Sequence, residues 1–455
     1  MQKRNKQFFF SLFMVMALLL GACAQATPET AATQEPEAPA EQEPAAAGPA
    51  SITFWHAMSG SRADVIAGIA DRFNASQDQY QVTAEYTGSY AETLTKALAA
   101  YRTGEPPTIV QVYEVGTQTM LDSNATVPVH TLNKGEVDWN DIVPPILKYY
   151  SVDGNLYCMP FNSSTAMLYY NKDMLEAAGL DAEKPLTTWA EVEEYSKAVM
   201  DAGLAEGGFS MGWPAWILEQ MFAYHDQLLA DKDNGRSGLA SEVYLNSEFG
   251  VKVMAEWQRM AEEGVLVYGG REYSANDPFL AGQFPFLFQS TSSLGGILKA
   301  AEFKVGTAFL PRFEGYPQGN SVVGGGCLWL MDKSSPEQQA GAWEFFKFVN
   351  SVDETIAWHK GTGYFPATVT AYEQLKTDGW FEEEPNHATA FNQILGGAET
   401  PAALGVLLGD FVQIRDIVGA GIEDVVVNGV DPQTAMDKAT ADSNQVLKNY
   451  AELNQ

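Results

Sequence analysis

One short motif in the chain could carry catalytic chemistry. Gly208 to Gly212 reads G-x-S-x-G, the pattern of a nucleophile elbow, in which Ser210 would lie on a turn between a strand and a helix. Here the segment follows a predicted helix and runs into Trp213-Pro214, which we do not expect to start a clean helix. Five-residue matches are common in a chain of 455 residues. Hydrolase chemistry is therefore a disfavoured alternative that steady turnover by the purified protein would revive.

Other catalytic and cofactor signatures are weak. Gly324 to Gly326 lacks the Lys-Ser/Thr pair that completes a phosphate-binding P-loop. The histidines are scattered, without HExxH or the close pairs typical of a metal site: His56, His130, His225, His359 and His387. We therefore predict a protein that is not an enzyme and that uses no metal and no other cofactor.

The elements that would position a binding site are clearest near the start of the folded region. Ile52 to Trp55, residues 82–86 and Thr108 to Val112 read as strands, and helical spacing of apolar residues fills the two gaps. Gly104 ends the second helix. This order is typical of a parallel or mixed sheet, in which ligands bind beyond the carboxyl ends of strands. The candidate ends are residues 56–58, 87–90 and 113–116.

A second α/β region is predicted to begin after Asn162. Thr188 with Glu191, and Ser335 with Gln338, have the spacing of capping boxes that start helices. No long linker divides the folded region, so we expect two α/β lobes joined by several short crossings. The first lobe is placed at residues 51–162 with about 292–345, and the second at 163–291 with about 346–455.

The N-terminus has the pattern of an export signal. A basic end, an apolar stretch from Phe8 to Leu20 and small residues before Cys23 predict a signal peptide over residues 1–22. A cysteine at this point resembles a bacterial lipobox, so Cys23 is the expected lipidation site. Residues 23–50 are rich in Ala, Pro, Glu and Gln and are predicted to be a disordered spacer. We expect an extracytoplasmic protein held at the cell membrane by its lipid alone.

Charge and cysteine usage narrow the function further. The formal net charge of −31 argues against nucleic acid as a partner, because such binding needs basic patches. It also keeps a protein soluble and unassociated, so a monomer is expected. Cys158 and Cys327 either form one disulfide after export or remain as two buried thiols. We favour buried thiols, because a chain of this length needs no covalent link for stability.

A series of short segments carries a resemblance to a known family. In chain order they are Phe54–Met58, Gln111–Gly116, Pro160–Ser164, Leu168–Asp173, Gly212–Trp216, Trp358-His359, Thr362–Pro366 and Gln413–Arg415. Together they resemble the extracellular solute-binding proteins of sugar-type ABC importers, and more narrowly those members that bind sn-glycerol-3-phosphate. The resemblance covers roughly residues 51–450 and departs from the family's usual plain, cleaved signal in its lipobox and spacer. It implies the larger two-lobed periplasmic-binding-protein fold, with a hinge and a ligand cleft between lobes. It also implies an ABC permease with a cytoplasmic ATPase as the partner.

The resemblance also implies a set of ligand contacts. Arg415 offers a planar fork for two phosphate oxygens, and Glu114 should accept hydrogen bonds from the glycerol hydroxyls. Two tryptophans would wall the carbon backbone, while serine and tyrosine hydroxyls and a glycine N–H donate. The full set is Tyr90, Glu114, Ser164, Trp213, Trp216, Ser290, Gly325, Tyr364 and Arg415.

The ligand itself stays open between three classes. Glycerol-3-phosphate is the expectation that the resemblance favours. A glycerophosphodiester keeps the same glycerol phosphate unit and is equally compatible. A neutral sugar or oligosaccharide is the alternative, although it needs no arginine for an anion.

Overall fold

The computed structural model describes residues 48–454. The predicted signal peptide, the lipidation site Cys23 and the spacer up to residue 47 lie outside the described residues. None of the helices between residues 48 and 454 is long and apolar enough to cross a membrane. The same part of the chain holds no group of three or more His, Cys, Asp or Glu side chains suited to a metal ion.

The first sheet has six strands and begins with the predicted strand–helix alternation. The order is β2-β1-β3-β12-β4, and β7 also pairs with β12. β1 runs parallel to both β2 and β3, while β12 is antiparallel to β3, β4 and β7. The predicted parallel or mixed sheet is therefore confirmed. The strands are β1 (Ala50–His56), β2 (Tyr80–Tyr86), β3 (Ile109–Tyr113), β4 (Thr126–Val127), β7 (Met159–Ser164) and β12 (Gly324–Met331).

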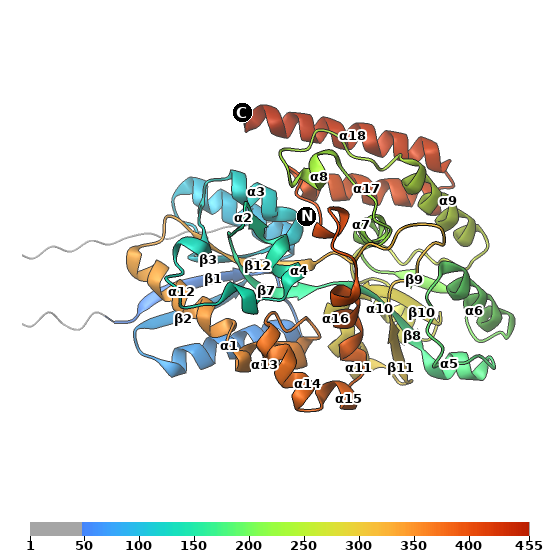
Figure 1. Cartoon of the computed structure of the whole chain (residues 1–455), viewed down its shortest axis with the longest axis horizontal. Coiled ribbons are helices and arrows are strands. Elements are labelled where there is room, and N and C mark those ends of the chain that lie inside the picture. The colour runs from blue at the N-terminus through green and yellow to red at the C-terminus, as the bar shows by residue number, and fades with distance from the viewer. Residues whose placement is uncertain (1–47, 455) are drawn as a thin grey trace, which may run out of the picture. The chain divides into compact units, whose positions relative to one another are not determined.

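Helices α1 (Ser61–Ser76) and α2 (Tyr90–Thr103) connect the three parallel strands. Right-handed crossovers in opposite directions along the sheet place the two helices on opposite faces, as Figure 1 shows. α1 buries Ile66, Ile69 and Phe73 against the sheet, at the helical spacing that the sequence predicted. α2 ends at Gly104, whose φ of 95° is a left-handed conformation that favours glycine.

The second sheet has four strands in the order β11-β8-β10-β9. β10 is parallel to β9, and β8 is antiparallel to both β10 and β11. Its strands are β8 (Ala166–Asn171), β9 (Phe209–Met211), β10 (Phe286–Ser290) and β11 (Val305–Ala308). Its nearby helices are α5 (Lys172–Ala177), α6 (Trp189–Asp201), α7 (Pro214–Tyr224) and α9 (Glu248–Glu262). Capping boxes at Thr188 and at Ser335 start α6 and α12 (Pro336–Val349), as predicted.

The C-terminal helices distribute themselves over both sheets. α13 packs on α1, α16 on β8 and β11, and α17 on α7, α9 and α18. The predicted lobe boundaries stay a prediction, and two pairings bear on them: β11 joins the sheet of β8, and α13 packs beside α1. These helices are α13 (Val352–Thr362), α14 (Val369–Thr377), α15 (Trp380–Glu383), α16 (Asn386–Gly396), α17 (Phe411–Val426) and α18 (Pro432–Leu453).

Short elements complete the connections between the sheets. β5 and β6, strands of two residues each, form a hairpin, and η1 continues directly from β3. They are β5 (Ser151–Val152), β6 (Asn155–Leu156), α3 (Thr117–Asp122), α4 (Pro144–Tyr149), α8 (Asp231–Gly235), α10 (Asn276–Leu280), α11 (Leu294–Ala300), η1 (Glu114–Gly116), η2 (Val129–Thr131), η3 (Trp139–Asp141), η4 (Thr291–Ser293) and η5 (Ala402–Leu404).

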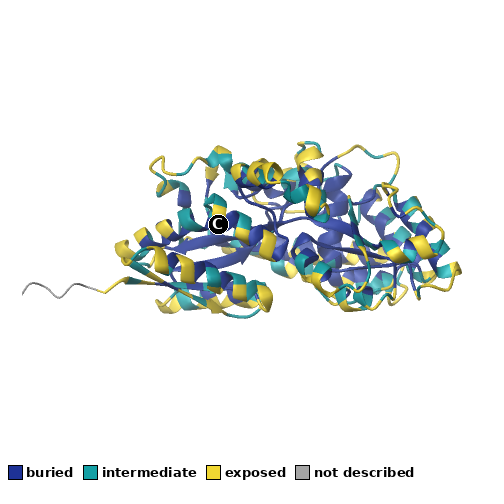
Figure 2. Cartoon of the chain, turned by 90° about the horizontal axis from the view of Figure 1, so that it is seen from below, coloured by how far each residue is buried: buried dark blue, intermediate teal, exposed yellow. Residues whose placement is uncertain are grey.

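The central strands of both sheets are buried. Figure 2 shows them in dark blue beneath helices whose outer residues are exposed, and every residue of β3, β7 and β10 is buried. Near-continuous apolar runs are typical of strands covered on both faces. The α/β class predicted from the sequence is confirmed.

The expectation of two free thiols is wrong, because Cys158 and Cys327 form a disulfide. Antiparallel pairing of β7 with β12 sets Met159 opposite Leu328 and Pro160 opposite Cys327, which brings the two cysteines together. The two thiols lie 169 residues apart in the sequence. The two cysteines lie close together because β7 pairs with β12. The stability argument that favoured free thiols takes no account of this strand pairing.

Candidate functional site

All nine sequence-predicted ligand contacts surround a single cavity. It is lined by them together with Tyr113, Tyr273 and Ser292. Strand ends build much of it: Glu114 follows β3, Ser164 ends β7 and Ser290 ends β10. Both sheets therefore supply side chains to the same cavity.

The strongest polar feature of the cavity is an arginine held by two carboxylates. Nε and Nη2 of Arg415 donate to the two carboxylate oxygens of Glu219, at 2.8 and 2.7 Å. Nη1 of Arg415 donates to Oε1 of Glu114 at 2.7 Å. The fork that was expected to face two phosphate oxygens is thus engaged by Glu219. We call these three residues the arginine clamp.

Burial makes the arginine clamp energetically sensitive. The exposed fractions of the three side chains are 11% for Arg415, 7% for Glu114 and 8% for Glu219. Burial opposes the charge of Arg415, but Glu219 and Glu114 outweigh it and raise the arginine pKa. Burial raises the pKa of Glu219, an effect that Arg415 opposes. With all three ionised, the clamp carries one net negative charge, and Oε2 of Glu114 has no partner within the described part of the chain.

The clamp is assembled by elements far apart in the sequence. Arg415 lies early in α17, and its guanidinium carbon sits 5.2 Å from the ring centroid of Phe411. Glu219 lies on α7, one turn beyond Trp216, and Glu114 opens η1 after β3. Sequence reasoning missed Glu219, although its i+3 spacing from Trp216 places both on one face of a helix.

Trp213 occupies an unusual backbone conformation at the edge of the cavity. Its φ of 55° and ψ of 53° are left-handed, which is rare for a bulky aromatic residue. A hydrogen bond of 3.0 Å from its N–H to the carbonyl of Glu272 holds the turn. Strain of this kind clusters at ligand sites, because the surroundings must over-determine it.

The structure corrects one expectation about this segment. α7 begins cleanly at Pro214, so β9, Trp213 and α7 do form a strand–turn–helix unit. Ser210 nevertheless lies inside β9 rather than on the turn, and it is fully buried. Its Oγ has no hydrogen-bond partner among the described residues, so no base is placed to activate it. The nucleophile-elbow geometry is not formed.

The tryptophan pair and the glycine pack closely around the cavity. Trp216 is buried against Gly324, and its Nε1–H has no acceptor within residues 48–454. Gly325 has a φ of 89°, and a Cβ there would collide with the carbonyl of Asn162. This position therefore requires glycine.

Hydroxyl groups complete the lining. The hydroxyls of Tyr90 and Tyr364 lie 3.4 Å apart, and the side-chain amide of Asn162 contacts Tyr90 Oη at 2.7 Å. Oγ of Ser290 accepts from the N–H of Ser292, so its own proton remains free to donate. Tyr113 stacks on Tyr90 with ring centroids 4.9 Å apart. Burial raises the pKa of Tyr90, which therefore stays a neutral hydroxyl near neutral pH.

Comparison with known proteins identifies the family. A model described as bacterial extracellular solute-binding protein matches residues 68–389. The chain belongs to this family. The sn-glycerol-3-phosphate-binding periplasmic protein UgpB of Salmonella typhimurium (strain LT2) is 36% identical over 409 residues, which cover 88% of this chain and 93% of the relative. The UgpB protein of Escherichia coli (strain K12) has the same identity and coverage.

Solved structures of solute-binding proteins share the fold. UgpB from Mycobacterium tuberculosis in complex with glycerophosphocholine has a TM-score of 0.75 at 22% identity, covering 89% of this chain and 99% of that one. The cyclic alpha-maltosyl-1,6-maltose binding protein from Arthrobacter globiformis has a TM-score of 0.73 at 22% identity, covering 88% and 100%. The predicted family and its two-lobed fold are confirmed. Solute-binding proteins deliver small molecules to ABC permeases from outside the cytoplasm.

Sequence reasoning did not single out three residues that line the cavity, Tyr113, Tyr273 and Ser292, nor Glu219, which contacts Arg415 behind the lining. Tyr113 precedes Glu114 in a quoted segment, so its position beside the predicted strand end was a usable signal. Glu219 carried the helical-spacing signal described above. Tyr273 and Ser292 come from loops and strand ends whose approach depends on the tertiary structure, and no local pattern marks them.

Proposed function

We propose that this solute-binding protein captures sn-glycerol-3-phosphate or a glycerophosphodiester and delivers it to an ABC permease, without catalysing a reaction. The observation that carries the proposal is the assembly of all nine expected contacts around one cavity. Relatives named as sn-glycerol-3-phosphate-binding proteins, 36% identical over most of the chain, support it. The free Oε2 of Glu114 can accept from the two vicinal hydroxyls of the glycerol unit.

The polar groups around the cavity suit a small polyol phosphate. Ser164 has no side-chain hydrogen bond within residues 48–454, and with Ser290 it offers donors to ligand oxygens. Trp213 and Trp216 would pack against the carbon backbone. A buried carboxylate that reads hydroxyls would also fix the direction of the ligand, because it repels the phosphate.

A neutral sugar is a second candidate, and one observation favours it. The guanidinium of Arg415 already has carboxylate partners on Nε, Nη1 and Nη2, so it offers an anion little unshared charge. Solved relatives of the same fold include a binding protein for cyclic alpha-maltosyl-1,6-maltose. A small cavity with aromatic walls accommodates a sugar ring as readily as a glycerol unit.

Calorimetric titration against a small panel decides between these candidates. The panel contains sn-glycerol-3-phosphate, glycerophosphocholine, maltose and glycerol. We expect saturable binding of sn-glycerol-3-phosphate or glycerophosphocholine and no binding of maltose. Binding of maltose alone would replace the proposal with the sugar alternative, and product formation from a phosphodiester during the titration would show an enzyme.

The lipid anchor at Cys23 is part of the same proposal, because capture near the membrane shortens the path to a permease. Replacement of Cys23 by Ala should release the protein from washed membranes while its ligand affinity stays unchanged. Retention of the variant in the membrane fraction would contradict the anchor.

A further inference from the structure

A second, larger cavity adjoins the one that holds the arginine clamp. Five residues line both cavities: Tyr90, Tyr113, Trp213, Tyr273 and Arg415. A ligand whose hydroxyls lie at Glu114 can therefore extend into this outer cavity past the shared aromatic residues.

The outer cavity contains a cation that the clamp does not use. Arg62 is the second residue of α1, is partly buried and lines this cavity. Its Nη1 donates to Tyr273 Oη at 2.9 Å, and its guanidinium carbon lies 4.9 Å from the centroid of that ring. Within residues 48–454, no carboxylate lies within 4.0 Å of it, whereas Arg415 has two carboxylate partners.

The charges around Arg62 decide which ligand group it can meet. Glu272 and Asp416 also line the outer cavity, and Asp416 lies 3.7 Å from Nη1 of Arg271. Besides the clamped Arg415, the rest of the polar lining consists of hydroxyl-bearing side chains: Ser59, Ser89, Tyr86, Tyr90, Tyr113 and Tyr273. Of the two arginines that line the outer cavity, only Arg62 is free of a carboxylate partner. The positive end of the α1 dipole adds to its potential.

We propose that Arg62, rather than Arg415, supplies the positive charge that binds the phosphate of the ligand. In this arrangement the arginine clamp orients Glu114 toward the glycerol hydroxyls, and Arg62 with the hydroxyl of Tyr273 holds the phosphate at the junction of the two cavities. The inference rests on the proposed function, since it assigns the two ends of a glycerol phosphate to two different arginines.

The division of labour has a chemical reason. A buried arginine shared by two carboxylates is already charge-compensated, so placing a dianion against it would leave excess negative charge in a dry site. Arg62 keeps two of its three guanidinium nitrogens without a hydrogen-bond acceptor among the described residues, and these form a fork suited to phosphate oxygens.

The test compares Arg62→Gln with Arg102→Gln, a matched control with the same loss of charge. Arg102 is exposed in the last turn of α2 and lines neither cavity. Charge-assisted hydrogen bonds of ~1.5–3 kcal/mol correspond to a loss of about ten- to 150-fold in sn-glycerol-3-phosphate affinity for Arg62→Gln. Arg62→Lys should recover part of the affinity, because a point charge lacks the fork. The control should bind as the wild type does.

A pH series separates charge recognition from a structural role of Arg62 between the cavities. A phosphate monoester gains its second charge with a pKa near ~6, so wild-type affinity should rise between about pH 5.5 and 7.5. The rise should shrink in Arg62→Gln. A phosphodiester such as glycerophosphocholine has no proton that titrates in this range, so its affinity should stay flat in both proteins. Melting temperatures of the ligand-free variants show that both fold.

Each outcome has a distinct meaning. If the wild type binds neither phosphate ligand, the proposed function fails and takes this inference with it. If the wild type binds and Arg62→Gln binds equally well, the phosphate is not at Arg62 and the inference alone is overturned. Weaker binding of sn-glycerol-3-phosphate with an unchanged pH dependence also overturns it, because Arg62 would then act through structure rather than charge.

Discussion

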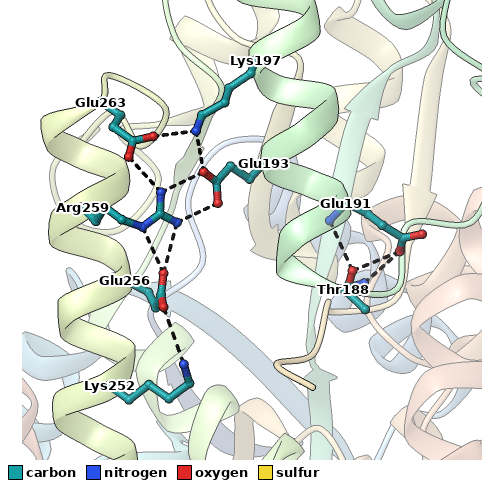
Figure 3. A network of polar contacts seen from close by, with 8 residues as sticks. All are labelled: Thr188, Glu191, Glu193, Lys197, Lys252, Glu256, Arg259 and Glu263. Atoms are coloured by element: carbon teal, nitrogen blue, oxygen red, sulfur yellow. Dashed lines mark hydrogen bonds and ion pairs between the residues drawn. The ribbon is translucent and has the colours of Figure 1, made fainter. Parts of the chain in front are cut away.

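Two arginines of this protein each sit among carboxylates, one on the surface and one beside the ligand cavity. Arg259 on α9 contacts Glu193 of α6 at 2.7 Å, Glu256 of its own helix at 3.1 Å and Glu263, the residue after that helix, at 3.0 Å (Figure 3). Its side chain is 41% exposed, against 11% for Arg415. The ion pairs of the two arginines have similar lengths, but the two side chains differ in their exposure to solvent.

The comparison shows that the number of ion pairs does not measure their consequence. Around Arg259, water screens each charge, and such pairs contribute roughly 0–1 kcal/mol each. In the arginine clamp, loss of one partner leaves a buried charge uncompensated, which costs ~3–5 kcal/mol. We therefore expect the surface network to tolerate change, while the clamp ties the stability of the fold to groups that line the cavity.

The largest expected effect breaks the clamp. Arg415→Met should lower the free energy of unfolding by ~3–5 kcal/mol, because Glu114 and Glu219 remain buried without a cation. Denaturant unfolding of the ligand-free protein measures this. Adding Glu114→Gln and Glu219→Gln to the same chain should restore much of the loss, since the variant then buries no unpaired charge. If Arg415→Met alone were as stable as the wild type, the ion pairs of the clamp would contribute no more to stability than the surface pairs of Arg259.

The next largest effect is expected on ligand binding, at the tryptophans that line the cavity beside the clamp. Trp213→Ala or Trp216→Ala should weaken ligand binding by ~1–3 kcal/mol, the range of other stacked aromatic contacts. Calorimetry with sn-glycerol-3-phosphate measures the change, with Trp139→Ala, outside both cavities, as the control. Unchanged affinity in both variants would assign this tryptophan pair to the core alone.

The contribution of the surface network to stability should be lost at low pH. Hydrogen bonds from Arg259, opposed by partial burial and aided by Lys197, lower the pKa of Glu193 from 4.5 to about 2. A carboxyl with a depressed native pKa contributes stability above its unfolded pKa, and that contribution disappears as pH falls from about 4.5 toward 2.

Glu193→Gln should therefore reduce the fall in melting temperature between about pH 5 and pH 3. Glu262→Gln, an exposed change on α9 without an ion pair in the described residues, is the control. Identical pH profiles for Glu193→Gln and the wild type would contradict the assigned depression of the pKa.

The smallest effect is expected at Arg259 itself. Arg259→Met should lower the free energy of unfolding by no more than about 1 kcal/mol for each ion pair lost at low salt, and by less in 0.5 M salt, where screening is stronger. Paired unfolding curves at the two salt concentrations measure it. A loss as large as that of Arg415→Met, independent of salt, would remove the distinction between the two arginines.

Local patterns account for much of what could be predicted. Arg259 meets Glu256 and Glu263 at i−3 and i+4, a spacing that can be read from the chain, and the capping box of Thr188 and Glu191 in Figure 3 is equally local. The helical spacing in α1 and the alternation in β2 are of the same kind. The nine predicted contacts that line the cavity came from the family resemblance and not from local patterns. The segments that contain them resemble a family whose members place those positions at a ligand.

The relations between distant segments could not be read in this way. The expectation that Trp213-Pro214 does not start a clean helix is wrong, because Pro214 is the first residue of α7. Glu219 and Arg62 were not singled out, because isolated charged residues on helices are usually solvated. The disulfide was judged by the stability needs of a long chain rather than by the pairing of β7 with β12.

The sequence by itself determined the strand–helix alternation of the first sheet and the starts of α6 and α12, because periodicity and capping act over a few residues. Only the tertiary structure decided that Arg415 is held by Glu219 and Glu114, 196 and 301 residues away. The same holds for the left-handed turn at Trp213 and for the position of Arg62 beside Tyr273. Each depends on the juxtaposition of remote segments, where burial turns an ordinary charge or turn into a functional feature.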